Sequence, residues 1–198
     1  MQLVVDNLAC RRAGRRVFED LSFTLHAGEA LAVMGRNGAG KSTLIAAMAG
    51  LVRRHAGEIR ASGIGDRTLA ESLHLVGHRD SLKASLTADE NLAFAADLLG
   101  NASLTPAEAL ARVGLPGAAD LPVGYLSAGQ RRRVALARLL VAQRPLWLLD
   151  EPLTALDAAG QGLLADIMAE HLSAGGLIVA ATHAALPIVG ARELRLGA

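Results

Sequence analysis

The chain contains 198 residues, of which 52% are hydrophobic, 20% are charged and only 3% are aromatic. This length favours one domain with a sizeable core over two independent cores. The 20 Lys and Arg residues nearly balance the 19 Asp and Glu residues, which gives a formal net charge of +1. A nearly neutral chain lacks the broad positive surface of duplex-binding proteins, so we expect no nucleic-acid partner.

The single cysteine, Cys10, excludes an internal disulfide, and the six histidines lack the spacing of a zinc module. We therefore expect a protein of a reducing compartment. The N-terminal residues do not have the pattern of a secretory signal. Polar or charged residues interrupt every apolar run before it approaches the roughly 20 residues of a spanning helix, so the chain is not expected to cross a membrane by itself.

Apolar runs predict strands, and segments with helical periodicity alternate with them. In chain order the predicted elements are strands 3–5, 17–25 and 30–34, helix 41–51, strand 73–76, helices 88–99, 106–113 and 130–141, strand 146–149, helix 157–172 and strand 177–181. This alternation indicates an α/β fold with a mainly parallel sheet covered by helices. Because 81–139 contains no convincing strand, we expect a helical lobe there, inserted into a core lobe formed by 1–80 and 140–198.

The segment 35–42 reads Gly-Arg-Asn-Gly-Ala-Gly-Lys-Ser and lies between a predicted strand and a predicted helix. This is the phosphate-binding loop of P-loop NTPases in the context that the loop requires. Its glycines turn backbone N–H groups toward an anion, Lys41 supplies charge for the β- and γ-phosphates, and Ser42 is placed to bind Mg²⁺. The predicted ATP contacts here are Gly35, Arg36, Asn37, Gly38, Ala39, Gly40, Lys41, Ser42 and Thr43.

Two carboxylates, Asp150 and Glu151, follow the apolar strand 146–149, at the edge where parallel sheets usually bind ligands. Asp150 is placed to hold Mg²⁺ directly or through water. Side chains alternate along an extended segment, so Glu151 points elsewhere and can deprotonate the water that attacks the γ-phosphate. We predict that Glu151 is the general base.

A second anion site is predicted where Ser127, Ala128, Gly129 and Gln130 precede a helix. It cannot easily serve the same phosphate loop within one chain. With this segment the chain resembles the ATP-binding cassette family of ATPases, whose signature motif lies here, with Ala128 where a glycine is most common. The phosphate loop, signature, carboxylate pair and His183 follow in the family's order, so the resemblance covers essentially the whole chain.

The resemblance implies a homodimer in which two copies face head to tail, with ATP between the phosphate loop of one and the signature of the other. It also implies that Asp157 lies in the segment that crosses to the opposite protomer. His183 would contact the γ-phosphate and help to hold the attacking water and Glu151, although a lone histidine after an apolar strand is more often structural. ATP and Mg²⁺ are the implied cofactors.

The sequence departs from the family at two positions. Arg12 is nearest the place where the family usually stacks an aromatic residue on adenine, and its planar guanidinium can also stack on a base. Phe18, in the alternating strand 17–25, is expected in the core. His78 stands where the family typically has a glutamine that reaches the Mg²⁺ site and links it to the helical lobe.

Segments 77–92 and 126–138 resemble one subfamily, the ATP-binding subunits of heme exporters used in cytochrome c maturation. This implies separate transmembrane permease subunits of a heme-export complex, docked near 78–86, and a peripheral position at the cytoplasmic face of the inner membrane. An importer or efflux ATPase for another cargo is the alternative within the class. A soluble ATPase that acts on DNA or ribosomes lacks support, because one short cassette leaves no room for a coiled-coil insertion or a second cassette.

The run Arg131, Arg132 and Arg133 is the one concentrated positive segment. It predicts a solvated helix face, and its place after the signature leaves open that one arginine meets the opposite nucleotide or a membrane partner. Because the sequence contains no Cys-x-x-Cys-His motif, we do not expect this chain to bind heme specifically.

Overall fold

The computed structural model describes residues 1–12 and 14–197. The strands are β1 (Gln2–Arg12), β2 (Arg15–His26), β3 (Ala30–Met34), β4 (Ala56–Ser62), β5 (Leu73–Val76), β6 (Leu146–Asp150), β7 (Leu177–Ala181) and β8 (Arg192–Arg195). The α-helices are α1 (Lys41–Met48), α2 (Ala88–Leu99), α3 (Pro106–Arg112), α4 (Ala128–Val141) and α5 (Ala158–Ser173). Short 3₁₀ turns lie at Ala70–Ser72 and Val123–Tyr125.

The central sheet has the strand order β5-β6-β7-β3-β8, and all neighbouring strands are parallel. Every residue of β6 and β7 is buried. Strands covered on both faces read as continuous apolar runs, which explains why the sequence identified these two so clearly. The predicted α/β class with a parallel sheet is confirmed.

A second sheet, β2-β1-β4, is antiparallel and was not predicted. Only two residues separate β1 from β2, and such a short connection can join antiparallel strands but not parallel ones. The strands β4 and β8 were missed altogether. Each lies at the edge of its sheet and is largely exposed, so neither shows the apolar pattern of a buried strand.

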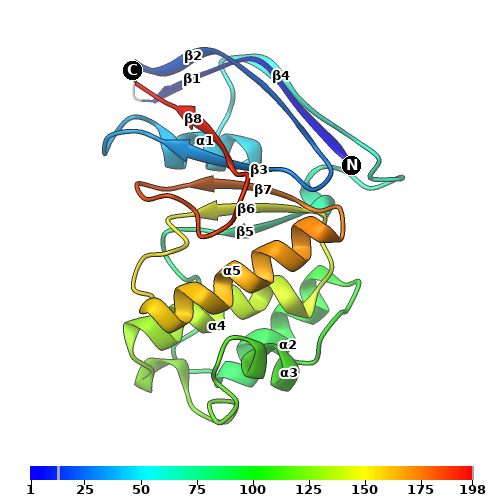
Figure 1. Cartoon of the computed structure of the whole chain (residues 1–198), viewed down its shortest axis with the longest axis vertical. Coiled ribbons are helices and arrows are strands. Elements are labelled where there is room, and N and C mark those ends of the chain that lie inside the picture. The colour runs from blue at the N-terminus through cyan, green and yellow to red at the C-terminus, as the bar shows by residue number, and fades with distance from the viewer. Residues whose placement is uncertain (13, 198) are drawn as a thin grey trace.

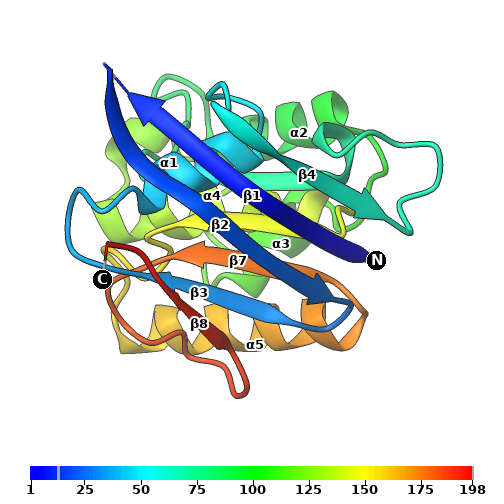
Figure 2. The same cartoon turned by 90° about the horizontal axis from the view of Figure 1, so that it is seen from above.

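The sheets and helices form layers (Figures 1 and 2). Helix α1 lies between the two sheets, where its apolar side chains join those of β1, β3 and β6 in one core cluster. Helices α4 and α5 cover the opposite face of the parallel sheet, and α2 and α3 pack on α4. All four share a second core cluster with the sheet. The parallel sheet therefore separates two cores, and its carboxyl edge is the place where segments from both cores meet.

Local sequence explains where the helices begin and end. Thr87, Thr105 and Ser127 each start a helix in a capping box, with Oγ accepting from a backbone N–H three residues later. Helix α1 ends at Met48, three residues before the predicted end. Gly50 adopts φ +74° there, which allows the backbone to close the helix with two hydrogen bonds to earlier carbonyls.

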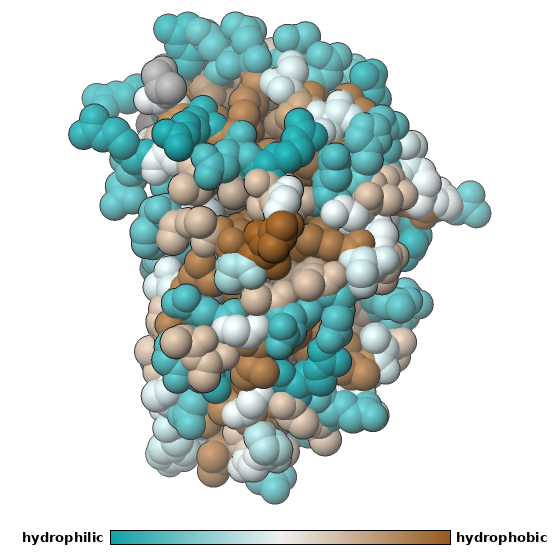
Figure 3. All heavy atoms as spheres, viewed as in Figure 1, coloured by the Kyte–Doolittle hydropathy of each residue, from teal (hydrophilic) through white to brown (hydrophobic). Residues whose placement is uncertain are grey.

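The surface is mixed in character. Figure 3 shows hydrophilic side chains over the antiparallel-sheet end and more apolar side chains across the middle of the same face. None of the helices in the described part of the chain has both the length and the apolar composition of a membrane-spanning segment.

The buried His74 and the half-buried His171 make stability depend on pH. His74 Nε2 lies 2.7 Å from the Ala142 carbonyl oxygen, and the His171 ring stacks on Trp147 with ring centroids 3.8 Å apart. Burial lowers the pKa of His74 and of His171 to about 4. The unfolded chain therefore binds protons near pH 6.5 that the folded chain excludes, so this stability is present above pH 6.5 and is lost as pH falls toward 4.

We expect each histidine to lower the free energy of unfolding by about 2 kcal/mol between pH 7 and pH 5. Urea unfolding at both values would measure the change, and His74→Gln should flatten the dependence. Equal pH dependence for the wild-type protein and the variant would contradict this expectation.

Candidate functional site

A cavity of about 630 Å³ opens at the carboxyl edge of the parallel sheet. Its volume is typical of sites for small molecules. The described residues that line it are Arg12, Val17, Asn37, Gly38, Gly40, Lys41, Ser42, Thr43, His78, Glu151, Thr154 and His183. Apart from Val17 and Thr154, these residues were predicted to share one site, and the fold brings them together from distant parts of the sequence.

The phosphate loop joins β3 to α1 and forms one wall of this cavity. A Cβ on Gly40 would lie 2.5 Å from Val17 Cγ1, and φ is +101°, so both packing and backbone require glycine there. Within the loop, Ala39 N–H donates to the Arg36 carbonyl. Neither Ala39 nor Arg36 is one of the described residues that line the cavity. The Lys41 side chain is 7% exposed and donates to the Gly35 carbonyl at 2.9 Å.

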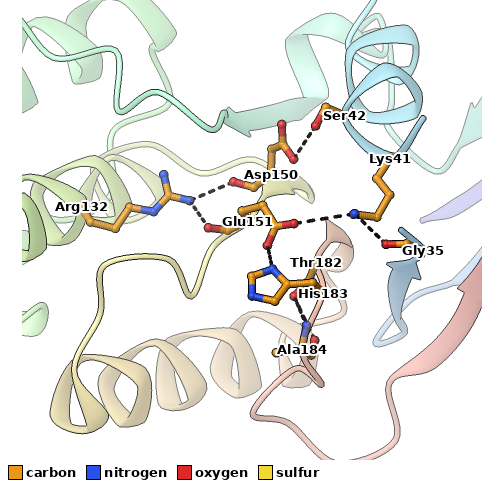
Figure 4. Close-up of polar contacts among 9 residues, drawn as sticks. All are labelled: Gly35, Lys41, Ser42, Arg132, Asp150, Glu151, Thr182, His183 and Ala184. Atoms are coloured by element: carbon orange, nitrogen blue, oxygen red, sulfur yellow. Dashed lines mark hydrogen bonds and ion pairs between the residues drawn. The ribbon is translucent and has the colours of Figure 1, made fainter. Parts of the chain in front are cut away.

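Oxygen donors from two elements meet beside the loop. Ser42 Oγ, on the first turn of α1, donates to Asp150 Oδ1 at 3.0 Å, as Figure 4 shows. Hydroxyl and carboxylate oxygens are the hard ligands that Mg²⁺ prefers, so Ser42 and Asp150 fit this ion. No group of three or more His, Cys, Asp or Glu residues in 1–12 and 14–197 could hold a metal. A bound Mg²⁺ would therefore take further ligands from phosphate oxygens or water.

Glu151 points away from Asp150, but for a different reason from the predicted one. Strand β6 ends at Asp150, and Glu151 has φ +50°, the left-handed conformation that non-glycine residues rarely adopt. Its N–H donates to the Ala181 carbonyl at 2.8 Å. The turn directs Oε1 to within 4.0 Å of Lys41 Nζ, so one carboxylate oxygen faces the phosphate loop.

The other carboxylate oxygen of Glu151 meets His183 (Figure 4). His183 Nδ1 lies 2.7 Å from Glu151 Oε2, and because an ionised carboxylate only accepts, Nδ1 bears the proton. Thr182, which sequence reasoning missed, is 1% exposed and exchanges two hydrogen bonds with the backbone of Ala184. Thr182 thereby fixes the turn that presents His183.

The signature residues lie elsewhere, at the beginning of α4. Ser127 and Gln130 form the capping box, with Ser127 N–H donating to Gln130 Oε1 at 2.8 Å. A Cβ on Gly129 would lie 2.9 Å from the Ala155 carbonyl oxygen, so the signature packs directly against the turn after Glu151. Of the described residues that line the cavity, none comes from 127–130.

The prediction that three arginines form a solvated helix face is wrong for Arg132, which is 3% exposed. Arg131 and Arg133 are half-buried. Arg131 donates to the Leu126 carbonyl, and Arg133 pairs with Asp157. These contacts instead hold α4 against neighbouring segments of the chain. The sequence did not indicate this, because charge alone shows neither the burial of a side chain nor its partner.

Asp157 caps helix α5, accepting from Gly160 N–H at 2.9 Å. This hydrogen bond and the neighbouring Arg133 hold the pKa of Asp157 below its ordinary value. Its side chain is 67% exposed, and its predicted role at the opposite protomer stays a prediction.

The two residues that depart from the family pattern both line the cavity, and their roles there stay predictions. Arg12, exposed at the end of β1, and Val17 of β2 line the cavity. Phe18 is 9% exposed and belongs to the core, which confirms its prediction. His78 is exposed in the loop after β5 and lines the cavity beside the phosphate loop.

A phosphate loop, an adjacent carboxylate pair and a parallel sheet define a P-loop nucleotide-binding protein. Comparison with known families narrows this class, because the ABC transporter family matches residues 18–154. The chain therefore belongs to the ABC transporter family, as an ATP-binding ATPase.

Curated relatives extend over the full chain. A protein of Rhodopseudomonas palustris strain HaA2 named cytochrome c biogenesis ATP-binding export protein CcmA is 53% identical to this chain. The alignment covers 100% of this chain and 99% of the relative. The protein of that name in Bradyrhizobium diazoefficiens is 54% identical over 100% of this chain and 98% of the relative.

Solved structures share the fold. An ABC transporter ATP-binding protein from Pyrococcus furiosus has a TM-score of 0.86 at 22% identity, over 99% of this chain and 98% of that one. An ATP-binding cassette in a dimeric post-hydrolysis state with ADP and Pi has a TM-score of 0.76 at 25% identity. The latter alignment covers 92% of this chain and 88% of that chain.

Proposed function

We propose that this chain is the ATP-hydrolysing subunit of an ABC transporter complex that powers heme export or handling in c-type cytochrome maturation. The main support is identity of 53% over the whole chain to a protein named for cytochrome c biogenesis and export. The transported cargo is handled by separate transmembrane permease subunits. The chain is bound peripherally to them at the cytoplasmic face of the inner membrane, with docking near 78–86.

Two copies act together in this proposal. Each ATP binds between the phosphate loop of one copy and residues Ser127, Ala128, Gly129 and Gln130 of the other. Support comes from the place of the signature outside the lining of its own cavity and from the solved dimer of a similar cassette. Asp157 lies at the contact between the copies, and the helical lobe 81–139 moves relative to 1–80 and 140–198 when the pair closes.

The chemistry follows from the positions of three side chains. Lys41 and the loop N–H groups bind the phosphates and balance their charge. Glu151 Oε1, which faces the phosphate loop, accepts a proton from the attacking water, while the N–H of His183 orients the carboxylate through Oε2. Ser42 and Asp150 would hold Mg²⁺, which would supply positive charge to balance the negative charge that develops on the phosphate oxygens.

Two cavity residues complete the site. Arg12 stacks its guanidinium on the adenine ring. This role is supported by its exposed side chain at the wall of the cavity. His78, which lines the cavity beside the phosphate loop, would link the Mg²⁺ region to the helical lobe.

A cellular experiment tests the cargo pathway. In cells whose only copy carries Glu151→Gln, apocytochromes should be made normally but covalent heme attachment should fail, whereas b-type cytochromes should stay intact because they need no attachment. Heme-stained gels of membrane fractions would measure this. Glu170→Gln makes the same chemical change at a surface ion pair and serves as the control. Normal c-type staining with Glu151→Gln present at wild-type level would remove the cytochrome role and favour another cargo.

A further inference from the structure

Arg132 is a buried arginine that joins three segments around the candidate site. It lies on α4, and its guanidinium reaches the loop after β5 and the end of β6. Nη1 donates to the Gly77 carbonyl at 2.9 Å and to Asp80 Oδ1 at 3.1 Å. Nη2 donates to the carbonyls of Asp150 at 3.0 Å and Glu151 at 2.8 Å (Figure 4).

The two Nη2 contacts bear directly on the conformation of Glu151. The Asp150 and Glu151 carbonyls belong to the peptide units on either side of the Glu151 α-carbon. Fixing both units fixes the φ and ψ of Glu151, whose φ of +50° is unfavourable for a glutamate. Arg132 therefore opposes relaxation of this residue into an ordinary conformation, in which its carboxylate would point elsewhere.

The two Nη1 contacts bear on the loop that contains His78. Gly77 and Asp80 flank this histidine, and Asp80 is the one carboxylate that pairs with Arg132 among the described residues. A single guanidinium thus ties the His78 loop and the Glu151 turn to the helix that begins with the signature.

Stability alone does not explain a charge at this place. The Nε of Arg132 is buried without a hydrogen-bond partner, and Asp80 is 26% exposed. Burying an arginine incurs a desolvation penalty that a single pairing often fails to offset. The arrangement instead specifies geometry, because the planar guanidinium donates in fixed directions to four acceptors.

We propose that Arg132 is a positioning residue for ATP hydrolysis, which holds Glu151 in its left-handed conformation and links it to the His78 loop. This inference rests on the proposed role of Glu151 as the general base.

Steady-state ATPase measurements on the full chain test it. Arg132→Gln should lower kcat about tenfold or more while KM for Mg·ATP changes less than about threefold, because phosphate contacts are untouched. Arg132→Lys should retain part of the rate, since an ammonium reaches fewer acceptors. Arg112→Gln, which breaks a surface ion pair with Glu170, is the matched control and should keep the wild-type rate.

A double variant separates positioning from general loss of structure. In single-turnover hydrolysis, Arg132→Gln should lower the rate of Glu151→Gln by less than about twofold, because both changes act through one carboxylate. Full multiplication of the two effects would overturn the proposal. If Arg132→Gln does not fold, Arg132→Lys and Asp80→Asn replace it, and wild-type kcat in both would overturn the proposal as well.

The same assay distinguishes the two claims. Wild-type hydrolysis by Glu151→Gln would refute the proposed general base. Loss of hydrolysis in Glu151→Gln together with wild-type kcat in Arg132→Gln would refute the positioning role alone.

Discussion

Replacing Glu151 with glutamine is expected to lower ATP hydrolysis on the order of a hundredfold or more. Glutamine preserves size but cannot accept the proton of the attacking water, whereas the nearby Ser42 and Asp150 stay intact for Mg²⁺ and Lys41 for phosphate. ATP should therefore still bind, and the closed pair should accumulate because it cannot reopen through hydrolysis. Phosphate release would measure the rate, and size-exclusion chromatography with Mg·ATP would measure pairing.

The control for this variant is Glu170→Gln, on the exposed surface of α5, which should hydrolyse ATP at the wild-type rate and show no stable pair. A persistent monomer of Glu151→Gln with saturating Mg·ATP would argue against ATP sandwiched between two copies.

Lys41→Ala should lose both nucleotide binding and turnover. The Lys41 side chain is 7% exposed, and its ammonium donates to the Gly35 carbonyl at the cavity wall, so its removal deletes a preorganised charge for the phosphates. Equilibrium binding of ATP should fall below detection at concentrations that saturate the wild-type protein. Retained binding with lost turnover would assign Lys41 to chemistry rather than to affinity.

Mixing variants tests whether the site is composite. Ser127→Ala removes a signature hydroxyl, and a mixture with Lys41→Ala can assemble one intact site if the signature acts on the opposite copy. Partial recovery of ATPase activity is then expected on mixing. Ser127 also caps α4, and loss of a cap costs about 1 kcal/mol, so Thr105→Ala at the cap of α3 is the matched control. No recovery, with pairing confirmed, would indicate a site within one chain.

The buried elements of the fold could be predicted because their sequences have strong patterns. Strand β7 and helix α2 have the predicted bounds, and β6 extends one residue beyond its prediction. The edge strands β4 and β8 could not be predicted. They are held by backbone pairing to one neighbour, and their exposed side chains need not be apolar, so their sequences lack the pattern of a strand. The antiparallel sheet was missed because the predicted first strand, 3–5, ends well before β1 does at Arg12, so the short connection to β2 was not apparent from the sequence.

The site could be predicted where local sequence determines backbone shape, as in the phosphate loop. The closeness of Glu151 and His183 was expected from the resemblance to the family. Thr182 and Arg132 could not be found in this way, because their roles depend on partners brought near by the fold. The charge of Arg132 suggested that its side chain is exposed to solvent. In the structure, four acceptors from distant segments make its burial possible.

The backbone conformation at position 151 has an evolutionary consequence. Asparagine, aspartate and glycine enter the left-handed region more readily than glutamate does, so the glutamate at this position adopts a conformation that its residue type disfavours. Under the proposed role of Glu151 as the general base, selection for turnover and selection for folding would act in opposite directions at this position. A descendant of this protein that no longer needed to hydrolyse ATP would be released from the first pressure, and drift toward asparagine or glycine at this position would mark that loss.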